Sequence, residues 1–170
     1  MSETETTPTP RPPVIVVGLG NPILSDDAAG ILVARELATR LPADRVEVTE
    51  SMRGGLDLME LIAGYTTAHL IDAIQTRREP AGHIWRLEVD DLPPALTLAS
   101  SHEVDLPTAL RFAEKMGYKV PSRIAIWAIE VSDPYTVSEQ LSEPVRQAIP
   151  LCVEQILAEL REDGTVEVNT

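Results

Sequence analysis

The stretch VIVVGLGNPILSDDAAG, residues 14–30, decides the predicted fold. Its first six residues are apolar and rich in β-branched side chains, a pattern typical of a strand buried on both faces. Asn21-Pro22 ends this strand, and we expect Ser25 or Asp26 to cap the helix that follows. Apolar residues recur at helical spacing from Ala29 until Pro42 ends the helix. A buried strand joined by a short loop to such a helix is typical of α/β proteins.

Strands and helices alternate along the rest of the chain. The patterns predict strands over residues 45–49, 68–73, 82–89 and 123–131, and helices over 56–63, 103–116 and 142–160. The 82–89 strand reads as an edge strand or a hairpin partner. We therefore expect a single-domain, three-layer α/β/α sandwich around a mostly parallel, twisted sheet of about five strands. The predicted domain covers residues 14–162, between a disordered N-terminal tail, 1–13, and a C-terminal tail, 163–170.

Composition narrows the class of function. A net charge of −13 argues against gripping nucleic acid, because that affinity comes from clustered Lys and Arg. The first 13 residues hold no apolar stretch, and the longest early apolar run, Val14 to Val17, is too short for an export signal or a membrane span. The single cysteine, Cys152, fits a reducing compartment, and its apolar helix face indicates a core residue rather than a nucleophile. We expect a cytoplasmic monomer that binds neither nucleic acid nor membrane.

Three loops could carry chemistry, because ligands of open parallel sheets bind at the carboxyl ends of the strands. They contain Asp26 and Asp27 after the first strand, Asp72 at the end of the third, and His102 before the 103–116 helix. Each residue also has a purely structural explanation, as a helix cap or a turn residue. Taken together, Asp27, Asp72 and His102 offer two oxygen ligands and one nitrogen ligand for a divalent metal. Ligand type alone does not separate nickel from zinc.

Two other interpretations of the first loop are weaker. Gly18-x-Gly20 is half of a dinucleotide fingerprint, but Ile23 stands where the third glycine would fall, and an acidic pair occupies the place of the pyrophosphate. The same opening is similar to that of peptidyl-tRNA hydrolases. Those enzymes need a histidine soon after the loop and a basic surface, whereas the next histidine here is His69 and the chain is acidic.

Residues 14–160 resemble the hydrogenase maturation endopeptidases, which trim the large subunit of NiFe hydrogenases. The resemblance is densest in residues 16–30 and continues at Gly54-Gly55, Ile71-Asp72-Ala73, Pro80-Ala81-Gly82, Ser101-His102 and the last helix. It implies that Asp27, Asp72 and His102 bind metal and that Gly20 and Asn21 shape the loop beside the substrate. The metal would be nickel supplied by the substrate, with zinc or cadmium able to replace it in the isolated protein.

The resemblance also implies a reaction: removal of a short C-terminal extension from the nickel-loaded precursor of the large subunit. No Ser-His-Asp, Cys-His or His-Glu-x-x-His set stands out, so no nucleophile is assigned, and Asp26 is a candidate only for orienting the loop or acting as a base. The alternative is a nickel-sensing chaperone that inspects the precursor without cutting it. Ser25 and Ala28 stand where the family often has glycine, and Asp105 either orients His102 or lies on the helix surface.

Overall fold

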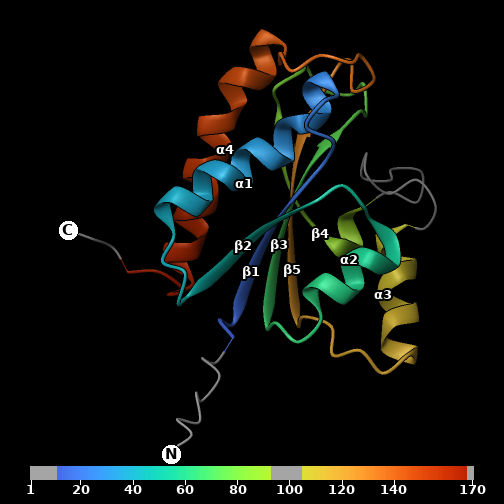
Figure 1. The fold of residues 1–170 in the computed structure, drawn as a ribbon, viewed down its shortest axis with the longest axis vertical. Coiled ribbons are helices and arrows are strands. Elements are labelled where there is room, and N and C mark those ends of the chain that lie inside the picture. Colours follow the sequence, from blue (N-terminus) through green and yellow to red (C-terminus); the bar gives the residue numbers. More distant parts are fainter. Residues whose placement is uncertain (1–10, 93–104, 168–170) are drawn as a thin grey trace, which may run out of the picture.

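A computed structural model describes residues 11–92 and 105–167 of the chain (Figure 1). Its elements, in chain order, are β1 (Val14–Leu19), η1 (Ser25–Ala28), α1 (Ala29–Arg40), β2 (Val46–Ser51), α2 (Gly55–Ile62), β3 (Thr67–Ile74), β4 (Ile84–Glu88), η2 (Val89–Asp91), α3 (Leu106–Lys115), β5 (Arg123–Glu130) and α4 (Glu143–Glu162). None of the helices in these two ranges is long and apolar enough to cross a membrane.

The five strands form one sheet in the order β2-β1-β3-β5-β4. Four of them are parallel, and only β4 runs antiparallel to its neighbour β5. The central strands β1, β3 and β5 are buried almost throughout, which explains why each reads as a continuous apolar run. The mostly parallel five-stranded sheet is confirmed, and the 82–89 pattern corresponds to the antiparallel edge strand β4.

Two helices cover each face of the sheet (Figure 1). Because successive side chains of a strand point to opposite faces, each central strand contributes to two separate cores. On one face, Val16, Ile71 and Trp127 share a core with residues of α1 and α4. On the other face, Val17, Leu70 and Ile126 share a core with residues of α2 and α3. The predicted three-layer α/β/α arrangement is confirmed.

The first helix lies unusually close to the sheet. A Cβ atom built on Gly30 would lie 2.3 Å from the carbonyl oxygen of Ile71 and 2.4 Å from that of Leu19. A Cβ atom on Gly18 would lie 2.5 Å from the carbonyl oxygen of Gly30. Real Cβ atoms do not approach so closely, so both positions need glycine for lack of space. The start of α1 therefore rests directly on the backbones of β1 and β3.

Residues next to both ends of the predicted domain also contact it. The Arg11 guanidinium lies over the ring of Tyr65, 4.8 Å from its centroid, and the carbonyl of Pro13 accepts a hydrogen bond of 2.8 Å from the Thr66 amide. Val166 is buried, and the Asp163 carboxylate pairs with Arg123 at 3.1 Å. Residues 11–13 and 163–167, assigned above to the two tails, thus pack on the domain.

The close approach of α1 predicts the effect of Gly30→Ala. Alanine is the better helix former by about 1 kcal/mol, yet the clash with two carbonyl oxygens should dominate and lower the free energy of unfolding by about 1–3 kcal/mol or more. Urea unfolding measures this change. The matched control is Ala38→Gly, an exposed position of the same helix, which should lose only the propensity difference of about 1 kcal/mol. A Gly30→Ala protein at least as stable as the wild type would contradict the contact.

Candidate metal-recognition site

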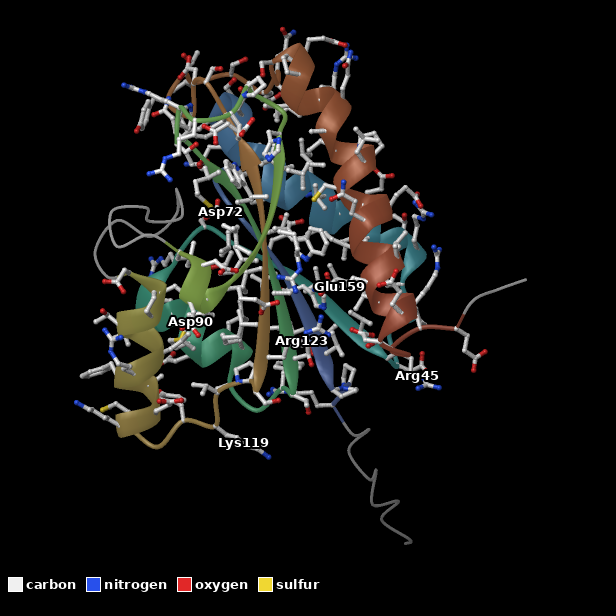
Figure 2. The ribbon with its side chains drawn as sticks, turned by 180° about the vertical axis from the view of Figure 1, so that it is seen from behind. Arg45, Asp72, Asp90, Lys119, Arg123 and Glu159 are labelled. Carbon is white, nitrogen blue, oxygen red and sulfur yellow. The ribbon has the colours of Figure 1, made fainter. Side chains whose placement is uncertain are left out.

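Two of the three predicted ligands lie at the carboxyl edge of the sheet. Asp72 is fully buried near the end of β3, next to Ala128 of β5 (Figure 2). Asp27 lies in η1 and is 8% exposed. The contact of Gly30 with the Ile71 carbonyl holds η1 against β3, because Gly30 follows Asp27 by three residues and Ile71 directly precedes Asp72. The structure thus brings both acids to the same edge.

The loop between β1 and η1 folds back on Asp27. One carboxylate oxygen of Asp27 accepts a 2.8 Å hydrogen bond from the Asn21 amide, and the Asn21 side-chain oxygen accepts one of 3.2 Å from the Ile23 amide. Gly20 has a φ of +138°, and a Cβ atom there would lie 2.0 Å from the Asp27 carbonyl oxygen. These contacts and the backbone of Gly20 set the path of the loop. A role of Gly20 or Asn21 beside the substrate stays a prediction.

The prediction that Ser25 or Asp26 caps the helix after β1 is wrong. Neither η1 nor α1 has a side-chain cap. The buried Asp26 carboxylate instead accepts hydrogen bonds from the amide and the hydroxyl of Ser142, at 2.7 and 2.8 Å, at the start of α4. The Ser25 hydroxyl donates to the Gln140 carbonyl at 3.1 Å. Both side chains thus bind the segment before α4. Of the two roles considered for Asp26, orienting the loop and acting as a base, these contacts favour orienting the loop.

The backbone of this loop is also tied to the segment before α4. The Ser25 amide donates to the Ser138 carbonyl at 2.7 Å, and the Ser138 amide donates to the Ile23 carbonyl at 3.1 Å. Ser25 itself adopts a φ of +32°, a left-handed conformation that glycine adopts without cost. The serine that stands where the sequence analysis expected glycine therefore adopts a backbone conformation that favours glycine.

The third predicted ligand, His102, lies outside the described residues. Within residues 11–92 and 105–167, no group of three His, Cys, Asp or Glu side chains could hold a metal ion. Asp27 and Asp72 supply carboxylate oxygens, which suit a divalent cation, and buried carboxylates favour a positively charged partner. Their chemistry fits an incomplete metal site that other ligands must complete. His102 as the third ligand stays a prediction.

A further buried acid at this edge escaped the sequence analysis. Glu130 ends β5, opposite Ile74, and its carboxylate accepts hydrogen bonds from Thr76, Arg77 and Trp85. The distances are 2.7 Å from both the amide and the hydroxyl of Thr76, 2.9 Å from the Arg77 amide and 3.1 Å from the Trp85 indole. Glu130 thus fixes the turn that follows Asp72 and β3. Its signal in the sequence was a single acid at the end of a continuous apolar strand.

Three other polar residues serve the structure. Asp105 caps α3 by accepting hydrogen bonds from the amide and hydroxyl of Thr108, which hold the pKa of its carboxyl below the usual range. A cap was not considered for Asp105 in the sequence analysis, and the suggestion that Asp105 orients His102 stays a prediction because His102 lies outside the described residues. Burial lowers the pKa of His69 to about 4, and its Nδ1 accepts a hydrogen bond from Trp127. Cys152 is fully buried among the core residues, which confirms a core residue, and this burial raises the pKa of its thiol to about 12.

The cross-link between Asp26 and Ser142 predicts a coupling energy. Asp26→Ala should cost about 2–4 kcal/mol of the free energy of unfolding, because it removes two charge-assisted hydrogen bonds and leaves the Ser142 groups without that acceptor. A double-mutant cycle with Ser142→Ala, measured by urea unfolding, should give an interaction energy of about 1 kcal/mol or more. Strictly additive effects would show that the two residues do not depend on each other.

A family model and two known proteins are similar to this chain. The family described as "Hydrogenase maturation protease" matches residues 31–159. The chain is 29% identical over 159 residues to the hydrogenase 2 maturation protease of Escherichia coli, covering 89% of this chain and 92% of the relative. It is 30% identical over 151 residues to a putative hydrogenase maturation protease of Methanocaldococcus jannaschii, covering 87% and 96%.

Solved structures agree on the fold. The hydrogenase maturating endopeptidase HybD of Escherichia coli superposes with a TM-score of 0.72 at 24% identity, over 89% of this chain and 93% of that one. A hydrogenase maturation protease from Thermococcus kodakarensis gives 0.67 at 21% identity, over 87% and 92%. The family match spans well over half of the chain, in the order of elements described above. The chain therefore belongs to the hydrogenase maturation protease family.

Proposed function

We propose that this protein is the endopeptidase that removes a short C-terminal extension from the nickel-loaded precursor of a NiFe-hydrogenase large subunit. The observation that carries the proposal is the pair of buried acids, Asp27 and Asp72, at the carboxyl edge of the sheet of a hydrogenase maturation protease. We infer that it acts in the cytoplasm as a monomer. Its net charge of −13 favours a basic surface on the precursor.

In this proposal the acid pair recognises the metal on the substrate. Asp27 and Asp72, with His102 as the expected third ligand, present hard and borderline donors to nickel that the precursor already holds through its thiolates. A site without a thiolate of its own should bind free metal weakly, so the metal arrives with the substrate. Zinc or cadmium would occupy the same ligands in the isolated protein.

The surrounding contacts support this recognition by keeping the two carboxylates in place. The amide of Asn21 donates to Asp27 and the amide of Ala73 donates to Asp72, both at 2.8 Å. The bonds from Ser142 to Asp26 and from the 76–77 turn to Glu130 hold the segments that follow β1 and β3. Ligands fixed in this way lose little conformational freedom when they meet the metal.

Asp27→Asn and Asp72→Asn test the proposal with the least structural change. Each variant keeps the size and one oxygen of the side chain but removes its negative charge, so processing of the nickel-loaded precursor should fall by about 100-fold or more. Mass spectrometry of the precursor during incubation measures the rate. The matched control is Asp57→Asn on α2, an exposed acid paired with Arg53, which should process at the wild-type rate.

The outcomes separate the candidates. If Asp27→Asn, Asp72→Asn and His102→Ala all process at the normal rate, the proposed site is wrong. If the wild-type protein binds the loaded precursor but never changes its mass, the protein is the nickel-sensing chaperone instead of a protease.

Removal of nickel gives an independent prediction. A precursor prepared without nickel should stay uncut by the wild-type protein, because the acid pair then has no metal to bind. Loading the same precursor with nickel should restore cleavage, which is again read as a change of mass. Equal cleavage of both forms would contradict metal recognition.

A further inference from the structure

Three exposed apolar residues lie in the loop that carries Asp27 and in the segment bonded to it. Ile23, in the loop after β1, is 53% exposed, and Tyr135 and Val137, between β5 and α4, are 73% and 75% exposed. We call these three residues the apolar ledge. In Figure 1 the segment between β5 and α4 lies over the start of α1. A group of large, solvent-exposed apolar side chains is typical of a surface that binds a partner.

The backbone under the apolar ledge is held in place. A parallel bridge joins Leu24 to Ser138, which sets Ile23 beside Val137, and two hydrogen bonds of 2.7 and 3.1 Å connect the two segments. The Asp133 carboxylate accepts hydrogen bonds from the amides of Tyr135 and Thr136 at 2.9 and 3.1 Å, and from the Thr136 hydroxyl. A preorganised surface of this kind loses little entropy when a partner binds.

The backbone connects the apolar ledge with Asp27, one member of the acid pair. The Asp27 amide donates to the Leu24 carbonyl at 2.8 Å, so the residue after Ile23 contacts the residue that carries the recognition carboxylate. Asp26, next to Asp27, is bonded to Ser142 on the far side of the same segment. A substrate whose metal sits at the acid pair would therefore lie next to the apolar ledge.

We propose that the apolar ledge binds an apolar segment of the precursor polypeptide close to its metal, and so contributes to the choice of substrate. This inference rests on the proposed function. The acid pair would recognise the metal on the substrate but not the side chains of the polypeptide. An endopeptidase must also hold the polypeptide in register with the bond that it cuts. The apolar ledge supplies side-chain contacts from the same rigid loop.

The negative charges around the apolar ledge favour the precursor polypeptide over other binding partners. Exposed acids, Asp133 and Glu139, flank the apolar ledge. An anionic lipid surface would be repelled by them. A second copy of this chain, itself carrying a net charge of −13, would meet like charge at the same place. A polypeptide segment with apolar side chains and neighbouring basic residues fits both features.

The test is the double variant Ile23→Ser, Val137→Ser with full-length nickel-loaded precursor as substrate. KM should rise about tenfold or more, while kcat changes much less, because full burial of one such side chain is worth about a tenfold change or more in binding. The control is Leu151→Ser, an apolar residue of α4 that is 59% exposed and should leave KM unchanged. Thermal unfolding verifies that all variants are folded, since the substituted side chains are exposed.

The results distinguish this inference from the proposed function. Wild-type cleavage together with an unchanged KM in the double variant overturns the apolar ledge as a substrate contact and leaves the protease intact. Binding of the precursor without cleavage, weakened in the double variant, supports the apolar ledge and overturns the protease. A wild-type dimer in sedimentation that becomes a monomer in the double variant, with KM unchanged, assigns the surface to a second copy and overturns the inference.

Discussion

The contact between the backbone of α1 and the backbones of β1 and β3 is the constraint on which the rest of this structure depends. It exists because Gly18 and Gly30 carry no side chain where a Cβ atom would lie 2.3–2.5 Å from carbonyl oxygens. Since Gly30 rests on Ile71, η1 is brought to the end of β3 and Asp27 to the edge that contains Asp72. The same position lets Asp26 reach the first turn of α4.

Four buried acids at one edge of a sheet would be costly without partners, because burying a charge requires compensating contacts. Asp26 and Glu130 accept hydrogen bonds from several groups each and hold two loops in place. Asp27, next to Asp26, and Asp72, near the end of β3, carry the proposed recognition of metal. The contacts of Asp26 and Glu130 thus fix the segments that follow β1 and β3, as a site of exact geometry requires.

The site and the apolar ledge together offer a physical basis for selectivity. In the proposed function, the carboxylate pair would distinguish a nickel-loaded precursor from an empty one, and the apolar contacts would distinguish one polypeptide from another. Asp27 and the apolar ledge belong to a single cross-linked unit formed by the loop after β1 and the segment before α4, whereas Asp72 comes from β3. In the proposal, binding at the metal and at the apolar ledge together fixes the polypeptide in one register, which cleavage at a defined bond requires.

The sequence by itself determined the order of strands and helices, the mostly parallel sheet and the family, and it predicts the carboxyl edge as the place for chemistry. These conclusions rest on local periodicity, on glycine and proline, and on the neighbours of each acid in the chain, all of which are visible in a short window of sequence. His102 is a residue that the sequence alone still assigns to the site.

The partner of each acid was decided only by the tertiary structure. Asp26 reads as the cap of the next helix, yet it binds Ser142, 116 residues away, because α1 and α4 cover the same face of the sheet. Glu130 reads as the end of an apolar strand, yet it anchors a turn 53–54 residues earlier, because β5 pairs with β3. A carboxylate bonds to whichever donors the packing of strands and helices brings near it, and that choice is made by contacts between segments far apart in the chain.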